Sequence, residues 1–263
     1  MNNSQPIGIF DSGVGGTSIW CEVVQLLPQE NSIYLADSTN APYGEKPVDE
    51  IIALSKKNTE KLLEMGCKII VVACNTATTN AIKYLRENYQ VPIIGIEPAI
   101  KPAALNSRTK SIGILATKGT LSSELFSKTS ELYSKNINII EVVGKGLVKL
   151  IEQGEQNTPE MDHLLRNLLK PMLAAKIDYL VLGCSHYPYL LPKLKEILPE
   201  NVRIIDSGEA VARQTKKVLE QLNLLNKSNL RPTHKFYSNA DHNVLASMVD
   251  AKKNRIDVSY LDF

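Results

Sequence analysis

Short runs of consecutive apolar residues recur along the chain, and each run ends in polar residues. The clearest run covers residues 69–73 and is followed by Cys74, Asn75 and Thr76. An unalternating run of this length predicts a parallel strand that is buried on both faces. Thr76 is expected to cap a helix that begins near Ala77. Cys74 is therefore expected at the carboxyl end of a strand, where open α/β sheets bind ligands.

The same pattern of apolar runs occurs twice along the chain. The expected strands are residues 7–10, 33–36, 69–73 and 91–96 in the first half, and 111–117, 137–143, 179–182 and 202–206 in the second. Their matching order and similar spacing indicate an internal duplication. In each half the third strand runs into a cysteine, either Cys74 or Cys184. If the two halves face each other, these thiols approach a ligand from opposite sides.

Strands that alternate with helical segments predict the α/β class, with two similar domains and mainly parallel sheets joined by right-handed crossovers. We expect pseudo-twofold symmetry between the domains and an active site in the cleft between them. The remaining expected elements are a helix at 48–65 ended by Gly66, a helix at 209–225, a polar linker at 226–232, a short strand at 236–238 and a helix at 242–249. This last segment has no counterpart in the first half.

Composition narrows the classes of function. The chain has 263 residues, of which 43% are hydrophobic, so a normal globular core is available. The 30 basic and 28 acidic residues give a net charge of +2, which does not suggest nucleic-acid binding and suits a small anionic ligand better. The four cysteines are few and scattered, and no apolar stretch has the roughly 18 to 20 residues of a membrane span. We expect a cytoplasmic protein with reduced thiols and no membrane segment.

Two thiols on opposite faces of one ligand are suited to inverting a carbon stereocentre. One acid–base group removes a proton from one face, and the other returns a proton to the opposite face. The polar residues after each cysteine are expected to begin helices, whose amino termini lower the pKa of a thiol and bind carboxylates. Asp11 and His186 are candidates to relay protons to Cys74 and Cys184.

Each of these features also has a structural alternative. A strand-end cysteine commonly packs as a small hydrophobe, and a single histidine is commonly structural. The glycine-rich segment 11–16 fits a tight strand-to-helix turn whose glycines adopt positive φ, and it lacks the P-loop and G-x-G-x-x-G patterns. No metal is expected, because Cys184 and His186 lack further ligands at suitable spacing. Cys21 and Cys67 lie on expected helical segments and are interpreted as unreactive.

Four segments together resemble the signature blocks of the glutamate racemase family. They are Asp-Ser-Gly-Val-Gly-Gly at 11–16, Pro-Tyr-Gly at 42–44, Ala-Cys-Asn-Thr-Ala at 73–77 and Gly-Cys-Ser-His-Tyr-Pro at 183–188. The resemblance runs in order from about residue 7 to residue 225. It implies cofactor-independent interconversion of L- and D-glutamate by two thiols, supplying D-glutamate for bacterial peptidoglycan. It also implies that residues 1–98 and 207–263 form the first domain and residues 99–206 the second.

The resemblance also assigns roles to individual residues. Cys74, assisted by Asp11, is expected to be the base acting on D-glutamate. Cys184, assisted by His186 and Glu152, is expected to be the base acting on L-glutamate. The implied substrate contacts are Asp11, Ser12, Pro42, Tyr43, Gly44, Asn75, Thr76, Thr117, Thr120, Ser185 and His186.

Two positions depart from the family pattern. Ser185 stands where the family has threonine, and it keeps the hydroxyl group. The segment 142–147 lacks the usual cysteine and proline, so Glu152 retains the alternative interpretation of a solvated helix carboxylate.

Three other functions stay open at this point. The first is racemisation of aspartate by a related enzyme with paired cysteines. The second is a non-catalytic binding or regulatory module, including an action on DNA gyrase of the kind reported for some glutamate racemases. The third is a thiol redox protein, which the missing Cys-x-x-Cys pair disfavours. A homodimer, as is common in the family, and activation by a peptidoglycan precursor are also left open.

Overall fold

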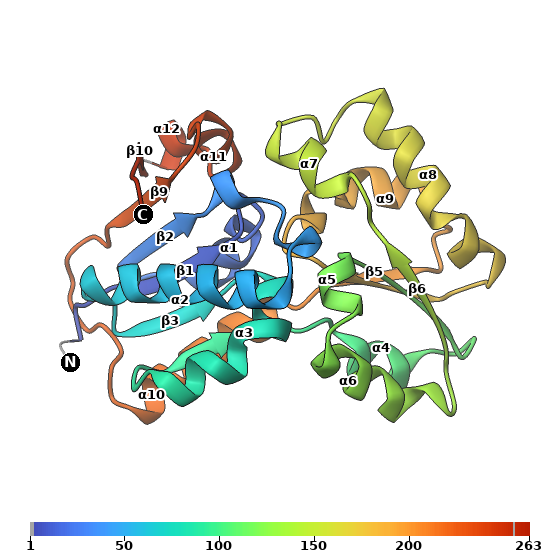
Figure 1. The fold of residues 1–263 in the computed structure, drawn as a ribbon, viewed down its shortest axis with the longest axis horizontal. Coiled ribbons are helices and arrows are strands. Elements are labelled where there is room, and N and C mark those ends of the chain that lie inside the picture. The colour runs from blue at the N-terminus through green and yellow to red at the C-terminus, as the bar shows by residue number, and fades with distance from the viewer. Residues whose placement is uncertain (1–2, 255) are drawn as a thin grey trace.

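The structure is a computed structural model that describes residues 3–254 and 256–263, and it contains two parallel sheets side by side (Figure 1). The first sheet has the order β10 (Asp257–Tyr260), β9 (His234–Ser238), β2 (Ser32–Ala36), β1 (Ile7–Asp11), β3 (Ile69–Val72) and β4 (Ile93–Gly95). The second sheet has the order β6 (Asn138–Val143), β5 (Ser111–Ala116), β7 (Tyr179–Gly183) and β8 (Arg203–Ile205). The strand order second, first, third, fourth occurs in both sheets. The internal repeat expected from the sequence is therefore present in the topology, and the predicted α/β class is confirmed.

Helices connect and cover the strands. They are α1 (Thr17–Leu26), α2 (Val48–Glu64), α3 (Asn75–Asn88), α4 (Ile100–Asn106), α5 (Lys118–Leu121), α6 (Glu124–Ser134), α7 (Leu147–Glu152), α8 (Pro159–Ala174), α9 (Leu191–Ile197), α10 (Gly208–Gln221), α11 (Asn243–Met248) and α12 (Ala251–Asn254). Three short 3-10 helices are η1 (Ser38–Asn40), η2 (Tyr43–Glu45) and η3 (Tyr187–Leu190). In the described ranges, no helix combines the length and the apolar character needed to cross a bilayer.

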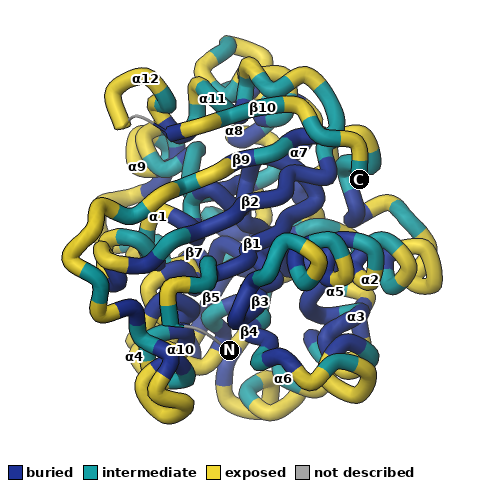
Figure 2. Tube along the Cα trace, turned by 90° about the vertical axis from the view of Figure 1, so that its left-hand side faces the viewer, coloured by how far each residue is buried: buried dark blue, intermediate teal, exposed yellow. Residues whose placement is uncertain are grey.

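The central strands are buried on both faces, as the unalternating apolar runs predict. Every residue of β1, β2, β3, β5 and β7 is buried, and these strands form the dark centre of Figure 2. Along β3, Ile69 and Val71 join one hydrophobic core, whereas Ile70 and Val72 join the core on the opposite face. Both faces of β3 are thus apolar, and Cys74, Asn75 and Thr76 follow directly after its end.

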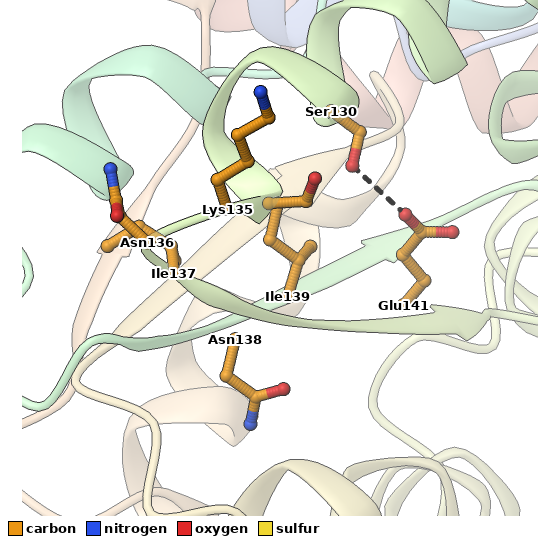
Figure 3. Close-up of a pocket in the computed structure, with 8 residues that line it drawn as sticks. Ser130, Lys135, Asn136, Ile137, Asn138, Ile139 and Glu141 are labelled. Atoms are coloured by element: carbon orange, nitrogen blue, oxygen red, sulfur yellow. Dashed lines mark hydrogen bonds between the residues drawn. The ribbon is translucent and has the colours of Figure 1, made fainter.

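The edge strand β6 differs from the central strands. Its residues are exposed or half-buried, and its outer side forms a shallow hollow with the end of α6. In that hollow the Ser130 hydroxyl donates a hydrogen bond of 3.3 Å to Glu141 Oε1 (Figure 3). The hollow contains no cysteine or histidine, so we assign it no catalytic role.

The carboxyl-terminal segment returns to the first sheet. Helix α10 packs against α1, β9 pairs with β2, and β10 completes the sheet, as the red and blue segments of Figure 1 show. The structure thus joins this segment to the first sheet, although the boundaries at 98/99 and 206/207 stay a prediction. Strand β10 was not expected from the sequence, and α10 ends at Gln221, earlier than expected.

Several local expectations are wrong. Helix α3 begins at Asn75, two residues earlier than predicted, because Cys74 itself occupies the cap position and Thr76 lies inside the helix. Only the 3-10 helix η3 follows Cys184 before α9 begins. Cys67 lies in the turn between α2 and β3, after Gly66, whose φ of +79° confirms its role as the helix stop.

Candidate active site

The two thiols lie at equivalent places in the two sheets. Cys74 follows β3 and Cys184 follows β7, and both strands are the third strand of their half. Both residues are buried, and both line one small cavity. The other residues that line this cavity are Ser12, Pro42, Tyr43, Gly44, Asn75, Thr76, Thr117, Val148, Ser185 and His186. Apart from Val148, these are residues to which the family resemblance assigns catalytic or substrate-binding roles, and those roles stay a prediction.

The surroundings of Cys74 favour its protonated, thiol form. Burial raises the pKa of Cys74 well above its usual value, and the nearby charge of Asp11 raises it further. The Ala77 amide donates a hydrogen bond of 3.4 Å to Cys74 Sγ and acts in the opposite direction, but it does not outweigh burial. The helix terminus thus lowers the pKa of this thiol as expected, but the net shift is upward because the whole side chain is buried.

Cys184 belongs to a chain of three groups. Its sulfur lies 3.7 Å from His186 Nδ1, and His186 Nε2 lies 2.5 Å from Glu152 Oε1. Burial lowers the pKa of His186, but the contacts with Cys184 and Glu152 outweigh burial and bring the pKa well above its usual value. The ring of His186 therefore lies between a sulfur atom and a carboxylate, and both contacts favour its protonated form.

Glu152 is half-buried and hydrogen-bonded at the site, and is not a solvated helix carboxylate. Its side chain is 14% exposed, and Oε1 accepts a hydrogen bond of 2.7 Å from the Val14 amide. Ser38 Oγ donates a hydrogen bond of 3.1 Å to Oε2. Glu152 comes from α7 of the second half, whereas Val14 and Ser38 belong to the first half. The carboxylate thus joins the two halves at the site.

The glycines of segment 11–16 make room for these groups. A Cβ atom at Gly13 would lie 1.9 Å from Glu152 Oε1, and one at Gly15 would lie 2.2 Å from His186 Nδ1. Neither glycine has a positive φ among the backbone angles of the structure, so the expectation of left-handed glycines is wrong here. The segment needs glycine because side chains from the second half approach its backbone closely.

Asp11 lies behind the cavity and does not line it. It is fully buried, and the Gly16 amide donates a hydrogen bond of 2.8 Å to its Oδ2. Ser185 Oγ donates to Oδ1 at 3.3 Å, and His186 Nδ1 lies 4.0 Å from Oδ2. Burial raises the pKa of Asp11, although the positive charge of His186 acts against this shift. Asp11 thus contacts Ser185 and His186 from the second half and influences Cys74 through its charge.

The position of Tyr43 in the cavity lining depends on residues that the sequence analysis missed. The Tyr43 hydroxyl donates a hydrogen bond to Asp37, and Asn58 Nδ2 donates to the same hydroxyl at 3.0 Å. Asp37 is fully buried and also accepts from Asn40 at 2.7 Å and from Asn239 at 2.5 Å. The position of Asp37 at the end of a buried strand could have identified it. Asn239 lies in the tail, where no sequence signal points to the site.

Hydroxyl and amide groups complete the cavity. Thr76 Oγ1 lies 2.7 Å from Thr117 Oγ1, which joins α3 of the first half to the second half. Thr120 lies 3.0 Å from Thr117 and outside the cavity lining, so it supports this wall without facing the cavity. Both polar atoms of the Asn75 side chain are buried without a hydrogen-bond partner among the described residues. Unpaired buried amides are rare, so this one indicates the place of a polar ligand.

Metal and disulfide chemistry find no support in the described part of the chain. No group of three or more His, Cys, Asp or Glu side chains is arranged there to hold a metal ion. All four cysteines are free thiols.

Comparisons with known proteins agree with this geometry. A family model described as Asp/Glu/Hydantoin racemase matches residues 20–215. A glutamate racemase from Ectopseudomonas mendocina is 45% identical over 243 residues, covering 92% of each chain. The crystal structure of a glutamate racemase isoform from Bacillus anthracis has a TM-score of 0.88 and 29% identity, covering 100% of this chain and 99% of that chain.

A further solved structure contains bound ligands. Glutamate racemase from Escherichia coli, in complex with L-glutamate and the activator UDP-MurNAc-Ala, has a TM-score of 0.85 and 31% identity over 98% of each chain. The match of sequence, fold and site covers nearly the whole chain. The chain is therefore an isomerase that belongs to the Asp/Glu/hydantoin racemase family.

Proposed function

We propose that this protein interconverts L- and D-glutamate without a cofactor, using Cys74 and Cys184 on opposite faces of the α-carbon. The observation that carries this proposal is the placement of two buried thiols, at equivalent strand ends, in one shared cavity. The substrate is inferred from the relatives, because solved structures of glutamate racemases contain L-glutamate in one case and D-glutamate in another. Glutamate is accordingly the first substrate to test.

In the direction from L- to D-glutamate, the Cys184 thiolate takes the α-proton, and the electron pair of the broken C–H bond is delocalised onto the α-carboxylate. The Cys74 thiol then donates its proton to the opposite face of the α-carbon. The raised pKa of Cys74 supports this role, because a thiol must hold its proton to act as the donor. The protonated His186 stabilises the Cys184 thiolate, and Glu152 stabilises the imidazolium.

After this step Cys184 carries a proton and Cys74 is a thiolate. This form is the one that accepts D-glutamate, so the reverse reaction uses the same groups with exchanged roles. Asp11 raises the pKa of Cys74 and therefore makes its thiolate the stronger base in that direction.

Binding is proposed to use polar groups around the cavity. Asn75 offers an amide group without a hydrogen-bond partner among the described residues, and Ser12 and Ser185 line the same cavity as the thiols. The amino terminus of α3 offers backbone amides and a favourable dipole for a carboxylate, and helix-terminal amides also stabilise the charge that develops in the reaction. We propose further that the D-glutamate produced supplies peptidoglycan synthesis, as the family resemblance implies.

Circular dichroism of each glutamate enantiomer, with purified protein and no added cofactor, tests the proposal. Both signals are expected to decay to zero with the parent protein and with Cys21→Ala, a control that removes a thiol outside the cavity. Cys74→Ala and Cys184→Ala are each expected to abolish racemisation. Racemisation that persists in either variant would refute the two-thiol mechanism. Loss of the circular dichroism signal with aspartate but not with glutamate would show that aspartate is the substrate.

A further inference from the structure

A second, larger hollow adjoins the thiol cavity. It has a volume of about 570 Å³. Pro42, Gly44, Thr117 and Val148 line both spaces and separate them. The hollow therefore lies against the wall of the thiol cavity.

Three lysines line this hollow from two sides. Lys118 begins α5, and Lys145 and Lys149 lie four residues apart at the start of α7. All three are exposed, and none forms an ion pair with another described residue. The lining contains one carboxylate, that of the exposed Glu45. The hollow thus has an excess of two positive charges.

The backbone that carries Lys145 is fixed by its two neighbouring glycines. A Cβ atom at Gly144 would lie 2.1 Å from the Tyr187 hydroxyl oxygen, so only glycine fits there. Gly146 has a φ of +86°, in the left-handed region that favours glycine. The two glycines therefore fix the backbone on both sides of Lys145, which lines the hollow. It also lies in the segment where this chain departs from the family pattern.

We propose that Lys118, Lys145 and Lys149 form an anion-collecting vestibule, which binds a carboxylate of incoming glutamate before the amino acid enters the thiol cavity. The identity of the ligand rests on the proposed function. Glutamate has two carboxylates and one ammonium group, so its net charge of −1 is attracted by the excess positive charge. Charges that line a cleft raise the local concentration of an oppositely charged ligand, and added salt removes this effect.

The test compares two triple variants with equal loss of charge. The first is Lys118→Gln, Lys145→Gln and Lys149→Gln. The control is Lys101→Gln, Lys135→Gln and Lys217→Gln, three exposed lysines outside the lining of both spaces. KM and kcat come from circular dichroism. The dissociation constant of glutamate comes from calorimetry, where racemisation itself adds no heat because enantiomers have equal enthalpy.

At about 0.01 M salt, where the Debye length is ~30 Å, the vestibule variant is expected to raise KM and the dissociation constant about three- to ten-fold. At about 1 M salt, where the Debye length is ~3 Å, KM and the dissociation constant of the vestibule variant are expected to equal those of the parent. The control is expected to shift either constant less than two-fold. Constants in the vestibule variant that equal those of the control at low salt would overturn the proposal.

Failure of the proposed function gives a different result. If the parent protein binds glutamate without racemising it, and binding still weakens in the vestibule variant, the vestibule stands while the proposed reaction fails. If the parent protein does not bind glutamate at all, both proposals fail.

Discussion

Replacement of Glu152 by glutamine separates the charge of this residue from its shape. Glutamine keeps an oxygen where Glu152 Oε1 accepts from the Val14 amide at 2.7 Å and contacts His186 at 2.5 Å. A hydrogen bond to a charged group contributes about 1.5–3 kcal/mol, whereas a neutral one contributes about 0.5–1.5 kcal/mol. The difference, about 1–2 kcal/mol, predicts a loss of about 5- to 30-fold in kcat/KM, since 1.36 kcal/mol is tenfold.

The pH profile gives a second readout of the same variant. Glu152 is one of the groups that raise the pKa of His186, so its neutral replacement lets the imidazolium lose its proton at lower pH. The alkaline limb of kcat/KM is therefore expected to move to lower pH. Because the enantiomers have equal free energy, kcat/KM must fall by the same factor in both directions, which provides an internal check on the assay.

Glu155→Gln is the matched control, because Glu155 is exposed and follows the same helix. It is expected to change kcat/KM less than two-fold and to leave the pH profile in place. The reasoning would be refuted if Glu152→Gln kept more than half of the parent kcat/KM with an unmoved alkaline limb. In that case Glu152 would join the two halves without supporting His186.

Three further predictions follow from contacts described by the structure. Gly15→Ala should lower kcat/KM more than about 100-fold with an unchanged far-ultraviolet spectrum, because the added Cβ displaces His186; near-parent activity would contradict this. Lys68→Met should lower the free energy of unfolding by about 3–5 kcal/mol in urea, because it leaves Glu30 as an unpaired buried charge; a loss below about 1 kcal/mol would contradict this. Iodoacetamide should modify the exposed Cys21 before the buried Cys74, as followed by peptide mass spectrometry. The rate of Cys74 modification should rise only at a pH above the usual pKa of a thiol, because burial raises the pKa of Cys74. Modification of Cys74 before Cys21 would contradict this.

The sequence predicted those parts of the fold that depend on local pattern. Unalternating apolar runs identified the buried strands, because a strand that is buried on both faces has apolar residues at successive positions. The repeated order of these runs identified the two sheets. The repeat also placed Cys74 and Cys184 at equivalent strand ends, and the two residues line one cavity in the structure. Strand β10 escaped prediction because an edge strand with exposed residues has no continuous apolar run.

Long-range contacts could not be predicted in this way. The segment that holds Gly13 and Gly15 looked like an ordinary turn, and its reason for glycine lies in side chains more than one hundred residues away. The pKa of Cys74 was expected to fall at a helix terminus, but the depth of burial, which no local pattern records, decides its direction. Asp37 was overlooked because one of its partners, Asn239, lies in a distant segment of the chain.

The bond between Asn239 and Asp37 has a consequence for the order in which activity arises during synthesis. Asp37 holds Tyr43 at the cavity, and Asn239 holds Asp37, yet residue 239 leaves the ribosome long after both thiols have been made. A nascent or truncated chain that ends before β9 contains both thiols. It lacks the hydrogen bond from Asn239 to Asp37 and the strands β9 and β10 of the first sheet. The cavity is therefore expected to reach its final form only after the last segment has been made and has paired with β2.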